Sequence, residues 1–420
     1  MYGQYGIHGG VQPEAYQALI YALHSPLVPS IKELIWNCSN IDAFRCIKLF
    51  ISPTLGVLHL MMTDEYGVYD ASRFSLLASL PILCPSISVL QLNAQPHRLG
   101  DTDVSDDKLL KGEISLHTST ALSAIQNLAH LQRLSFSFWK IQENAFCNVI
   151  SLPSLRYLSI ANTPLPGFRP PISQATRNCL LCLEHLNLSW GSIEFALWMV
   201  ANMWKTPLET MTLEFAQTLT VANVRALFQT MNHQIVHGTL RQISISSNGN
   251  ARSGMVDIGL TMAHLTPLLS FMNLTSMRLE YVAIALDDDD IIKISLAWPR
   301  LELLRVDKPA DSLHAVSLKG LAALAQNCRA LAELRLPLNT SNAVQDDFDL
   351  GNIACNQELR YLDVQTSPID NPSMVAAVLY KLFPNLETIY SIKTRETWKW
   401  DQVRKLIKKL AGKWQEKSKR

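Results

Sequence analysis

The sequence lacks the features of a membrane-spanning or disulfide-stabilised protein. Its 420 residues contain no uninterrupted apolar run of about 18 residues, the length that a membrane-spanning helix needs. No basic segment followed by an apolar run stands at the start, so we expect no signal peptide. The eight cysteines are scattered without a dense framework. We therefore predict reduced core thiols in a cytoplasmic or nuclear protein.

The sequence also lacks the motifs that carry catalysis. It has no Gly-rich phosphate loop, no GxSxG motif, and no nucleophile placed beside its 11 scattered histidines. Cys179 and Cys182 form a CxxC without a second ligand pair, which favours core thiols over a zinc site. The acidic run 287–290 lacks the alternating oxygen ligands of a calcium loop and suits the start of a helix. We predict no catalytic residue, no metal and no cofactor.

One six-residue pattern is abundant: apolar, two variable, apolar, one variable, apolar. Its successive copies begin 24 to 44 residues apart. This quasi-regular spacing indicates a repeat protein, in which each unit buries its apolar face only against its neighbours. The thirteen copies begin at Ile31, Leu55, Ile87, Leu131, Leu155, Leu183, Leu208, Leu240, Leu274, Leu301, Leu331, Leu359 and Leu386.

Residues 317–336 illustrate one repeat. Ser317 is placed to cap a helix whose apolar residues recur at helical spacing, and the segment ends near Cys328. Leu334 and Leu336 then alternate inward along a strand, while Glu333 and Arg335 point outward. Further helices are predicted over 72–80, 121–130, 221–232, 288–298 and 372–383. The predicted fold is an α/β leucine-rich-repeat solenoid, a horseshoe with a parallel concave sheet and helices on the convex side.

The chain is predicted to have three parts. Residues 1–30 form a capping segment with a short helix over about 13–24. Residues 31–392 form the solenoid, with a polar insertion near 99–118 that we expect to be a surface loop. Asn is largely missing from the places after the strands where regular repeats use it to tie neighbouring turns together.

Residues 393–420 form a basic amphipathic helix with Trp400, Val403, Ile407, Leu410 and Trp414 in one apolar stripe. This tail holds eleven basic and three acidic residues, whereas the remainder holds 26 and 33. It suits a helix that caps the last repeat. Two other readings stay open: binding to an acidic partner or anionic lipid, and nuclear localisation or nucleic-acid binding. The acidic body argues against nucleic acid as a partner.

The outward strand positions supply the candidate binding residues. Arg278, Arg305 and Arg335 occupy the fifth position of three consecutive repeats, so we expect a column roughly 10 Å long. With Tyr361 they form a candidate docking patch for an acidic or phosphorylated protein segment. The alternative is a solvated ladder neutralised by Glu280, Asp307 and Glu333, with Asp363 on the following strand.

Four phrases of the repeats are distinctive in combination: SPLVPSIKELIW, DDDDIIKISLAWPRLELLRV, SLKGLAALAQNCRALAELRLPLN and NQELRYLDVQTSPIDNPSMVAAVLYKLFPNLETI. Together they resemble the repeat region of F-box leucine-rich-repeat proteins from mushroom-forming fungi. The likeness covers roughly residues 25–392. It implies a repeat region that holds a substrate, in a family whose F-box docks on a cullin-RING ubiquitin ligase.

The resemblance does not extend to the F-box. Only 30 residues precede Ile31, without a Leu-Pro-rich helical opening. We expect the F-box to be missing, so that the ligase adaptor is a partner only if an F-box lies upstream of Met1. The predicted function is non-catalytic protein recognition through the concave face, resembling the substrate-binding part of an F-box receptor. The alternative is a free-standing repeat scaffold or inhibitor without a ubiquitin-ligase link.

Overall fold

The computed structural model describes residues 18, 22, 26–38, 46–63, 71–95, 123–137, 143–161, 180–247, 259–307, 316–340, 354–392 and 397–418. The chain divides into two compact units, Met1–Leu208 and Glu209–Arg420. Each is described by itself below. The predicted helix near 13–24, the insertion near 99–118 and Cys179 lie almost wholly outside the described residues.

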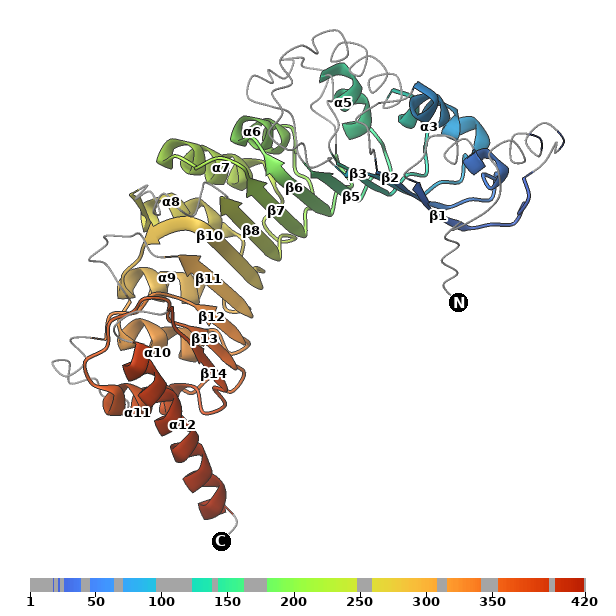
Figure 1. Ribbon diagram of the computed structural model, residues 1–420. Coiled ribbons are helices and arrows are strands. Elements are labelled where there is room, and N and C mark those ends of the chain that lie inside the picture. Colours follow the sequence, from blue (N-terminus) through green and yellow to red (C-terminus); the bar gives the residue numbers. More distant parts are fainter. Residues whose placement is uncertain are drawn as a thin grey trace, which may run out of the picture. The chain divides into compact units, whose positions relative to one another are not determined.

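The first unit is a parallel sheet whose strands pair in chain order. Equivalent repeat positions are in register; Leu34 is opposite Leu58, and Leu58 is opposite Leu90. The helices lie on one face of the strands (Figure 1). The strands are β1 (Glu33–Cys38), β2 (Val57–Thr63), β3 (Val89–Gln95), β4 (Arg133–Ser137), β5 (Tyr157–Ala161) and β6 (His185–Gly191), and the helices are η1 (Cys46–Leu49), α3 (Ala71–Leu83), α5 (Glu143–Ile150) and α6 (Ile193–Ala201).

The second unit repeats this plan with fuller helices. Its main strands are also parallel and in chain order, and a short strand β9 (Leu260–Thr261) pairs with the far end of β10. The other strands are β7 (Thr210–Phe215), β8 (Gln242–Ser247), β10 (Ser276–Ala285), β11 (Leu303–Asp307), β12 (Glu333–Arg335), β13 (Tyr361–Asp363) and β14 (Thr388–Tyr390). The helices are α7 (Val221–Gln234), α8 (Met262–Leu265), η3 (Thr266–Ser270), α9 (Asp288–Ala297), α10 (Leu318–Asn327), α11 (Pro372–Leu382) and α12 (Thr397–Ser418).

Each of the thirteen sequence patterns coincides with one strand, β1–β8 or β10–β14. The fourth-position side chains point toward the helices and are buried: Leu34 is 8% exposed, Leu186 and Leu304 are each 1% exposed, and Leu334 is 0% exposed. The first and sixth positions are buried almost throughout as well. The predicted α/β leucine-rich-repeat fold is therefore confirmed, because the hydrophobic effect fixes both the strand register and the buried face.

The helix starts of the second unit follow the predicted capping chemistry. Ser317 Oγ accepts a hydrogen bond from the Lys319 amide at 3.1 Å. Asp287 and Asp290 form a capping box at the start of α9, which confirms the interpretation of the acidic run as a cap. Asp288 goes further and joins two repeats, since its carboxylate accepts hydrogen bonds from the amides of Ser317 at 2.8 Å and Gly320 at 3.0 Å.

Two expectations about the segments that connect the strands are wrong. The predicted helix over 121–130 is helical only at 123–125 within its described part. Tight hydrogen bonds between residues three apart follow it, as from the Leu128 amide to the Ile125 carbonyl. Ile125, Leu128 and Leu131 are spaced by three and all buried, which a tighter turn satisfies as well as a helix. Of the cysteines, Cys182 and Cys355 are exposed, because they stand in turns outside the apolar rows.

Asparagine ties between repeats exist, but at a different place from the one expected. Asn356 Nδ2 donates to the Cys328 carbonyl at 2.7 Å, and Asn385 Nδ2 donates to the Gln357 carbonyl at 3.0 Å. Both residues precede their strands, so the ladder runs along the turn that enters each strand. Buried polar groups in these turns are thereby satisfied.

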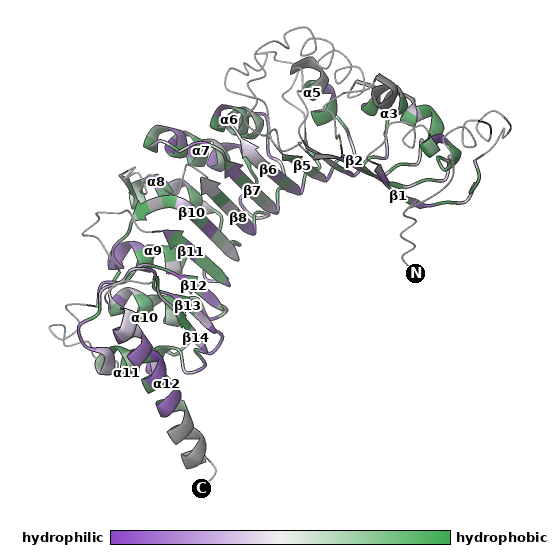
Figure 2. Cartoon of the chain, viewed as in Figure 1, coloured by the Kyte–Doolittle hydropathy of each residue, from purple (hydrophilic) through white to green (hydrophobic). Residues whose placement is uncertain are grey.

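Helix α12 packs on the last repeat through part of its apolar stripe. Trp400, Val403 and Ile407 are buried, whereas Leu410 is half-buried. Trp400 Nε1 donates to the Ser367 carbonyl at 2.9 Å, and Lys399 Nζ donates to the Ile369 carbonyl at 2.8 Å. Figure 2 shows the helix as largely hydrophilic. Within the described ranges, no helix combines the length and the apolar character needed to cross a bilayer.

Candidate functional site

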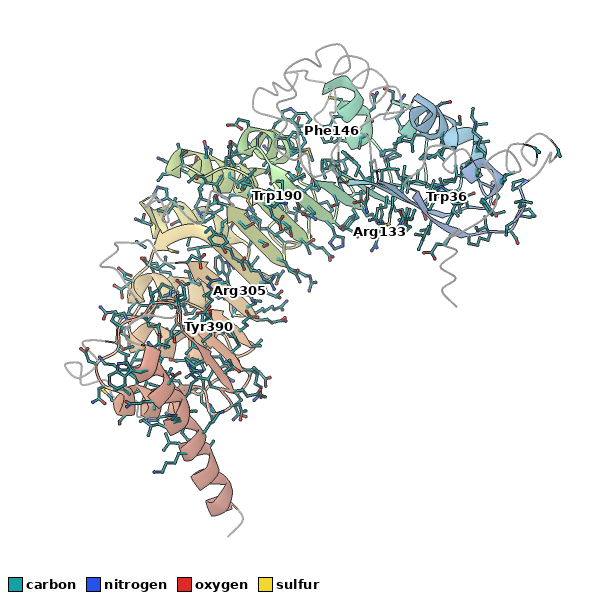
Figure 3. All side chains as sticks on the ribbon, viewed as in Figure 1. Trp36, Arg133, Phe146, Trp190, Arg305 and Tyr390 are labelled. Carbon is teal, nitrogen blue, oxygen red and sulfur yellow. The ribbon has the colours of Figure 1, made fainter. Side chains whose placement is uncertain are left out.

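The candidate site is the open face, which we define as the third, fifth and seventh positions of the patterns, on the side of the strands opposite the helices. Inward and outward side chains alternate along each strand. Burial follows this alternation; along β7 and β8 each inward residue is buried and most outward ones are half-buried. Figure 3 shows Arg133 in the first unit and Arg305 in the second on this side of their strands.

The predicted arginine column is present in the second unit. Arg278 on β10 is in register with Arg305 on β11, which is in register with Arg335 on β12. Ser244 precedes the column on β8, and Asp363 follows it on β13. The three arginines therefore stand on adjacent parallel strands, as expected from their shared fifth position.

Arg305 at the centre of the column is held by two carboxylates. Its Nε donates to Glu333 Oε1 at 2.6 Å, and its Nη1 donates to Glu280 Oε1 at 3.0 Å. Burial disfavours the charged guanidinium, but the hydrogen bonds to Glu333 and Glu280 outweigh this and raise the pKa of Arg305. Arg305 thus links three strands through its two carboxylate partners.

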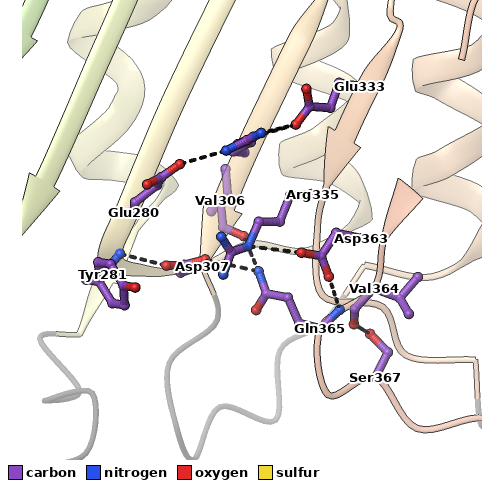
Figure 4. Close-up of polar contacts among 11 residues, drawn as sticks. Glu280, Tyr281, Val306, Asp307, Glu333, Arg335, Asp363, Val364, Gln365 and Ser367 are labelled. Atoms are coloured by element: carbon purple, nitrogen blue, oxygen red, sulfur yellow. Dashed lines mark hydrogen bonds and ion pairs between the residues drawn. The ribbon is translucent and has the colours of Figure 1, made fainter. Parts of the chain in front are cut away.

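Arg335 belongs to a more buried polar cluster (Figure 4). Its Nη2 lies 3.0 Å from Asp307 Oδ1, and its Nε lies 3.5 Å from Asp363 Oδ2. Gln365 Nε2 donates to Asp307 Oδ1 at 3.2 Å and to the Val306 carbonyl at 2.8 Å. Asp307 and Asp363 are only 1% and 5% exposed, so this cluster is part of the protein interior.

The two carboxyls of this cluster have raised pKa values. Burial is the main cause for Asp307, opposed by the Tyr281 amide hydrogen bond and by Arg335. Burial also raises the pKa of Asp363, opposed by the Gln365 amide hydrogen bond and by Arg335. Both carboxyls therefore lose more from desolvation than they regain from their partners.

Each of these aspartates also fixes a left-handed backbone turn. Tyr281 and Gln365 have φ of 57° and 53°, a region that side chains other than glycine rarely occupy. The Tyr281 amide donates to Asp307 Oδ2 at 2.6 Å, and the Gln365 amide donates to Asp363 Oδ1 at 2.8 Å. Asp307 and Gln365 both occupy the seventh position of the pattern, and their side chains link neighbouring repeats. Regular repeats use an asparagine after the strand for this link. The common position of Asp307 and Gln365 after the strand was the available signal.

Arg278 differs from the other two members of the column. Among the described residues it has no ion-pair partner. Its buried Nε makes no hydrogen bond, a feature that it shares with the Nε of Arg335. Its register neighbours are Ser244 on one side and Arg305 on the other. In the part of the chain that the structure describes, Arg278 is therefore a partly desolvated cation without an ion pair.

The tyrosines of this region stand at the end of the column. Tyr361 on β13 is in register with Glu333 and is half-buried. Burial, then the charges of Asp363 and Glu333, raise the pKa of Tyr361. Tyr390 on β14 is in register with Asp363 and is 50% exposed. Sequence reasoning named Tyr361 and missed the more exposed Tyr390.

The structure revises the expectation that the three arginines of the column form a docking patch of available positive charge. Arg305 and Arg335 were expected to be exposed; their side chains are only 30% and 25% exposed, and each is ion-paired twice. Against the three arginines stand four carboxylates, those of Glu280, Asp307, Glu333 and Asp363. The neutralised ladder is the better description of Arg305 and Arg335, because partners on both neighbouring strands are within reach.

The open face of the first unit has another chemistry. Among its described positions, Glu33 is the single carboxylate. The guanidinium of Arg133 lies 5.6 Å from the ring centre of Tyr157, which lies 6.0 Å from that of His185. Ile35 is 55% exposed and is followed on β2 and β3 by the half-buried side chains of Val57, Met61 and Val89.

The described residues contain no group of three His, Cys, Asp or Glu side chains placed to hold a metal ion. Burial raises the pKa of the Cys84 and Cys328 thiols to about 12, which makes them poor nucleophiles at neutral pH. The described side chains of the open face offer a partner charge, hydrogen bonds and aromatic surface.

Comparison with known proteins yields fold-level likeness alone. No protein-family model and no curated protein sequence matches the chain. Among solved structures, it resembles the Rad7 and Elc1 complex of yeast at 15% identity, covering 92% of this chain and 87% of that chain, with a TM-score of 0.40. It also resembles a leucine-rich-repeat protein of Leptospira interrogans at 13% identity, covering 90% of this chain and 76% of that chain, with a TM-score of 0.34.

Proposed function

We propose that the chain is a non-catalytic protein-recognition module that binds a partner polypeptide through the open face of its strands. One observation carries this proposal: the face brings together chemically diverse, solvent-accessible side chains from many separate repeats. Arg278, Tyr361 and Tyr390 come from β10, β13 and β14. Arginine and tyrosine are enriched among the residues that dominate protein–protein binding.

The role of each arginine now differs within this proposal. Arg305 and Arg335 shape the face through ion pairs, and they reach a partner only with their remaining exposed atoms. Arg278 and the tyrosines carry the contact itself. The tail helix α12 caps the last repeat, consistent with the burial of Trp400, Val403 and Ile407.

The sequence resemblance suggests one specific form of this function, the substrate-binding part of an F-box ubiquitin-ligase receptor. The second form is a free-standing scaffold or inhibitor that meets no ligase. The two forms use the same face and differ in the fate of the bound protein. Depletion of the ligase adaptor in cells would slow the turnover of the partner in the first form and leave it unchanged in the second.

Site-specific photocrosslinking tests the proposal. A photoreactive amino acid replaces Ser159 on β5 or Ser244 on β8, both on the open face. Matched controls replace Glu194 on α6 or Lys319 on α10, both exposed on the helical side. We expect the open-face positions to crosslink a polypeptide that the helical positions do not. Crosslinking from the helical positions alone, or from none, would reject recognition through this face.

A further inference from the structure

Arg278 is the arginine of the column that forms no ion pair within the described part of the second unit. Arg305 and Arg335 each have two carboxylate partners, whereas Arg278 has none among the described residues. Glu280, two residues along the same strand, is bonded to Arg305 instead. Glu214 stands on β7, two strands away from β10, and forms no ion pair with Arg278.

The surroundings of Arg278 favour a small anion. Its Nε is buried, so the guanidinium is partly removed from water, and Coulomb attraction is stronger there than in bulk solvent. Ser276 stands two residues before it on β10, and Ser244 is opposite it on β8. Their hydroxyls are hydrogen-bond donors of the kind that a bound oxyanion accepts.

The local charge balance distinguishes between anions. The column already faces four carboxylates, so an anion that pairs with Arg278 is favoured if it adds little further charge, and a carboxylate adds one unit. A phosphate group, which carries about −1.5 to −2 at neutral pH, would leave excess negative charge beside Glu280 and Glu333. From this geometry we infer that Arg278 anchors an Asp or Glu side chain of the partner polypeptide, and that Arg305 and Arg335 are not anchors.

This inference rests on the proposed function and names the chemistry of the partner at one point of the face. The probe that tests it needs no identified partner. It is a fluorine-labelled tripeptide, acetyl-Gly-Glu-Gly-amide, titrated with the full chain and followed by fluorine NMR. Acetyl-Gly-Gln-Gly-amide is the uncharged control, and acetyl-Gly-phosphoSer-Gly-amide tests the phosphate alternative.

We expect saturable millimolar binding of the Glu tripeptide and at least about tenfold weaker binding of the Gln tripeptide, the factor that a charge-assisted hydrogen bond supplies. Arg278→Gln should weaken the Glu tripeptide about tenfold as well, with Arg278→Lys falling between it and the wild type. Arg329→Gln, the matched control, removes an exposed arginine in the turn before β12 and should change the affinity less than twofold.

Three outcomes would overturn the inference: tighter binding of the phosphoserine tripeptide, equal losses in the Arg278 and Arg329 variants, or no difference between the Glu and Gln tripeptides. Unchanged thermal midpoints of the variants would show that lost binding is not lost folding. Since the titration uses no cellular partner, its failure is separate from a failure of the crosslinking experiment, which tests recognition through the face as such.

Discussion

The open faces of the two units are built on the same repeat and differ in charge. Both use inward leucines at equivalent positions, such as Leu158 in the first unit and Leu304 in the second. The first unit presents aromatic, apolar and hydroxyl groups with Glu33 as its one described carboxylate. The second presents a lattice of arginines and carboxylates that bond one another. The inward residues therefore define the fold, while the outward residues are free to differ.

The comparison also shows that charge on a surface is not the same as charge available to a partner. In the second unit, two of the three column arginines are occupied by their neighbours. In the first, Arg133 is exposed and lies over the ring of Tyr157 without a carboxylate on the adjacent open-face positions. The predictions below test this difference, beginning with the largest expected effect.

Of the changes considered, removal of residues 393–420 should cause the largest loss of stability, and the loss falls on the second unit. The truncation strips Trp400, Val403 and Ile407 from the last repeat, and burial of three such side chains stabilises by about 5 kcal/mol or more. We expect a lower thermal midpoint and increased binding of a hydrophobic dye. Truncation after Ala411, which retains these three side chains, is the control. An unchanged midpoint in the longer truncation would reject capping by α12.

Substitution of an inward leucine should have the same effect in either unit. Leu158→Ala and Leu304→Ala each remove a side chain that is at most 1% exposed, and each should cost about 2–5 kcal/mol through the cavity left behind. Chemical denaturation of both variants measures this. A loss in one unit and none in the other would contradict the shared inward register.

Asp307→Ala should destabilise the second unit by about 3 kcal/mol, because it leaves the Tyr281 amide and part of Arg335 without an acceptor in the interior. Glu33→Ala, an exposed carboxylate of the first unit, should stay within about 0.5 kcal/mol of the wild type. Equal effects in a denaturation experiment would show that the buried cluster is not structural.

The pH dependence of stability should reflect Asp307 and Asp363. Their pKa values are raised in the folded state, so that state binds protons more tightly than the unfolded chain. The stability that these two carboxyls contribute to the folded state is fully present below the ordinary carboxyl pKa of about 4. It is lost as the pH rises through their raised pKa values. The stability of the wild type relative to the Asp307→Asn/Asp363→Asn variant should fall between pH 4 and neutrality. A rise over that range would contradict the raised pKa values.

The smallest effect is expected in the first unit. Arg133→Ala removes a cation–π contact at 5.6 Å and should cost about 0.5–1 kcal/mol of stability. Tyr157→Leu on the wild-type and Arg133→Ala backgrounds completes a double-mutant cycle. Additive losses would show that the two side chains do not interact.

The strands could be predicted from the sequence because the buried pattern repeats with every unit. The arginine column followed from the same register. The register also named the carboxylates that neutralise them, Glu280, Asp307 and Glu333. Which arginine each carboxylate bonds could not be predicted, since that depends on a bulge of β10 where the register shifts. The helix expected over 121–130 failed because three-residue spacing suits a tight turn equally. The exposed Tyr390 was missed because its copy of the pattern loses its last apolar position, at Ser391.

Arginine-selective modification with phenylglyoxal, read by mass spectrometry of the folded chain, tests most directly whether the open faces differ in available charge. The side chains of Arg305 and Arg335 are 30% and 25% exposed, so accessibility alone would allow both to react. Because their guanidinium groups are held by carboxylates, we predict that both react several-fold more slowly than Arg278 and Arg133. Modification of Arg305 and Arg335 at the rate of Arg278 would contradict the account.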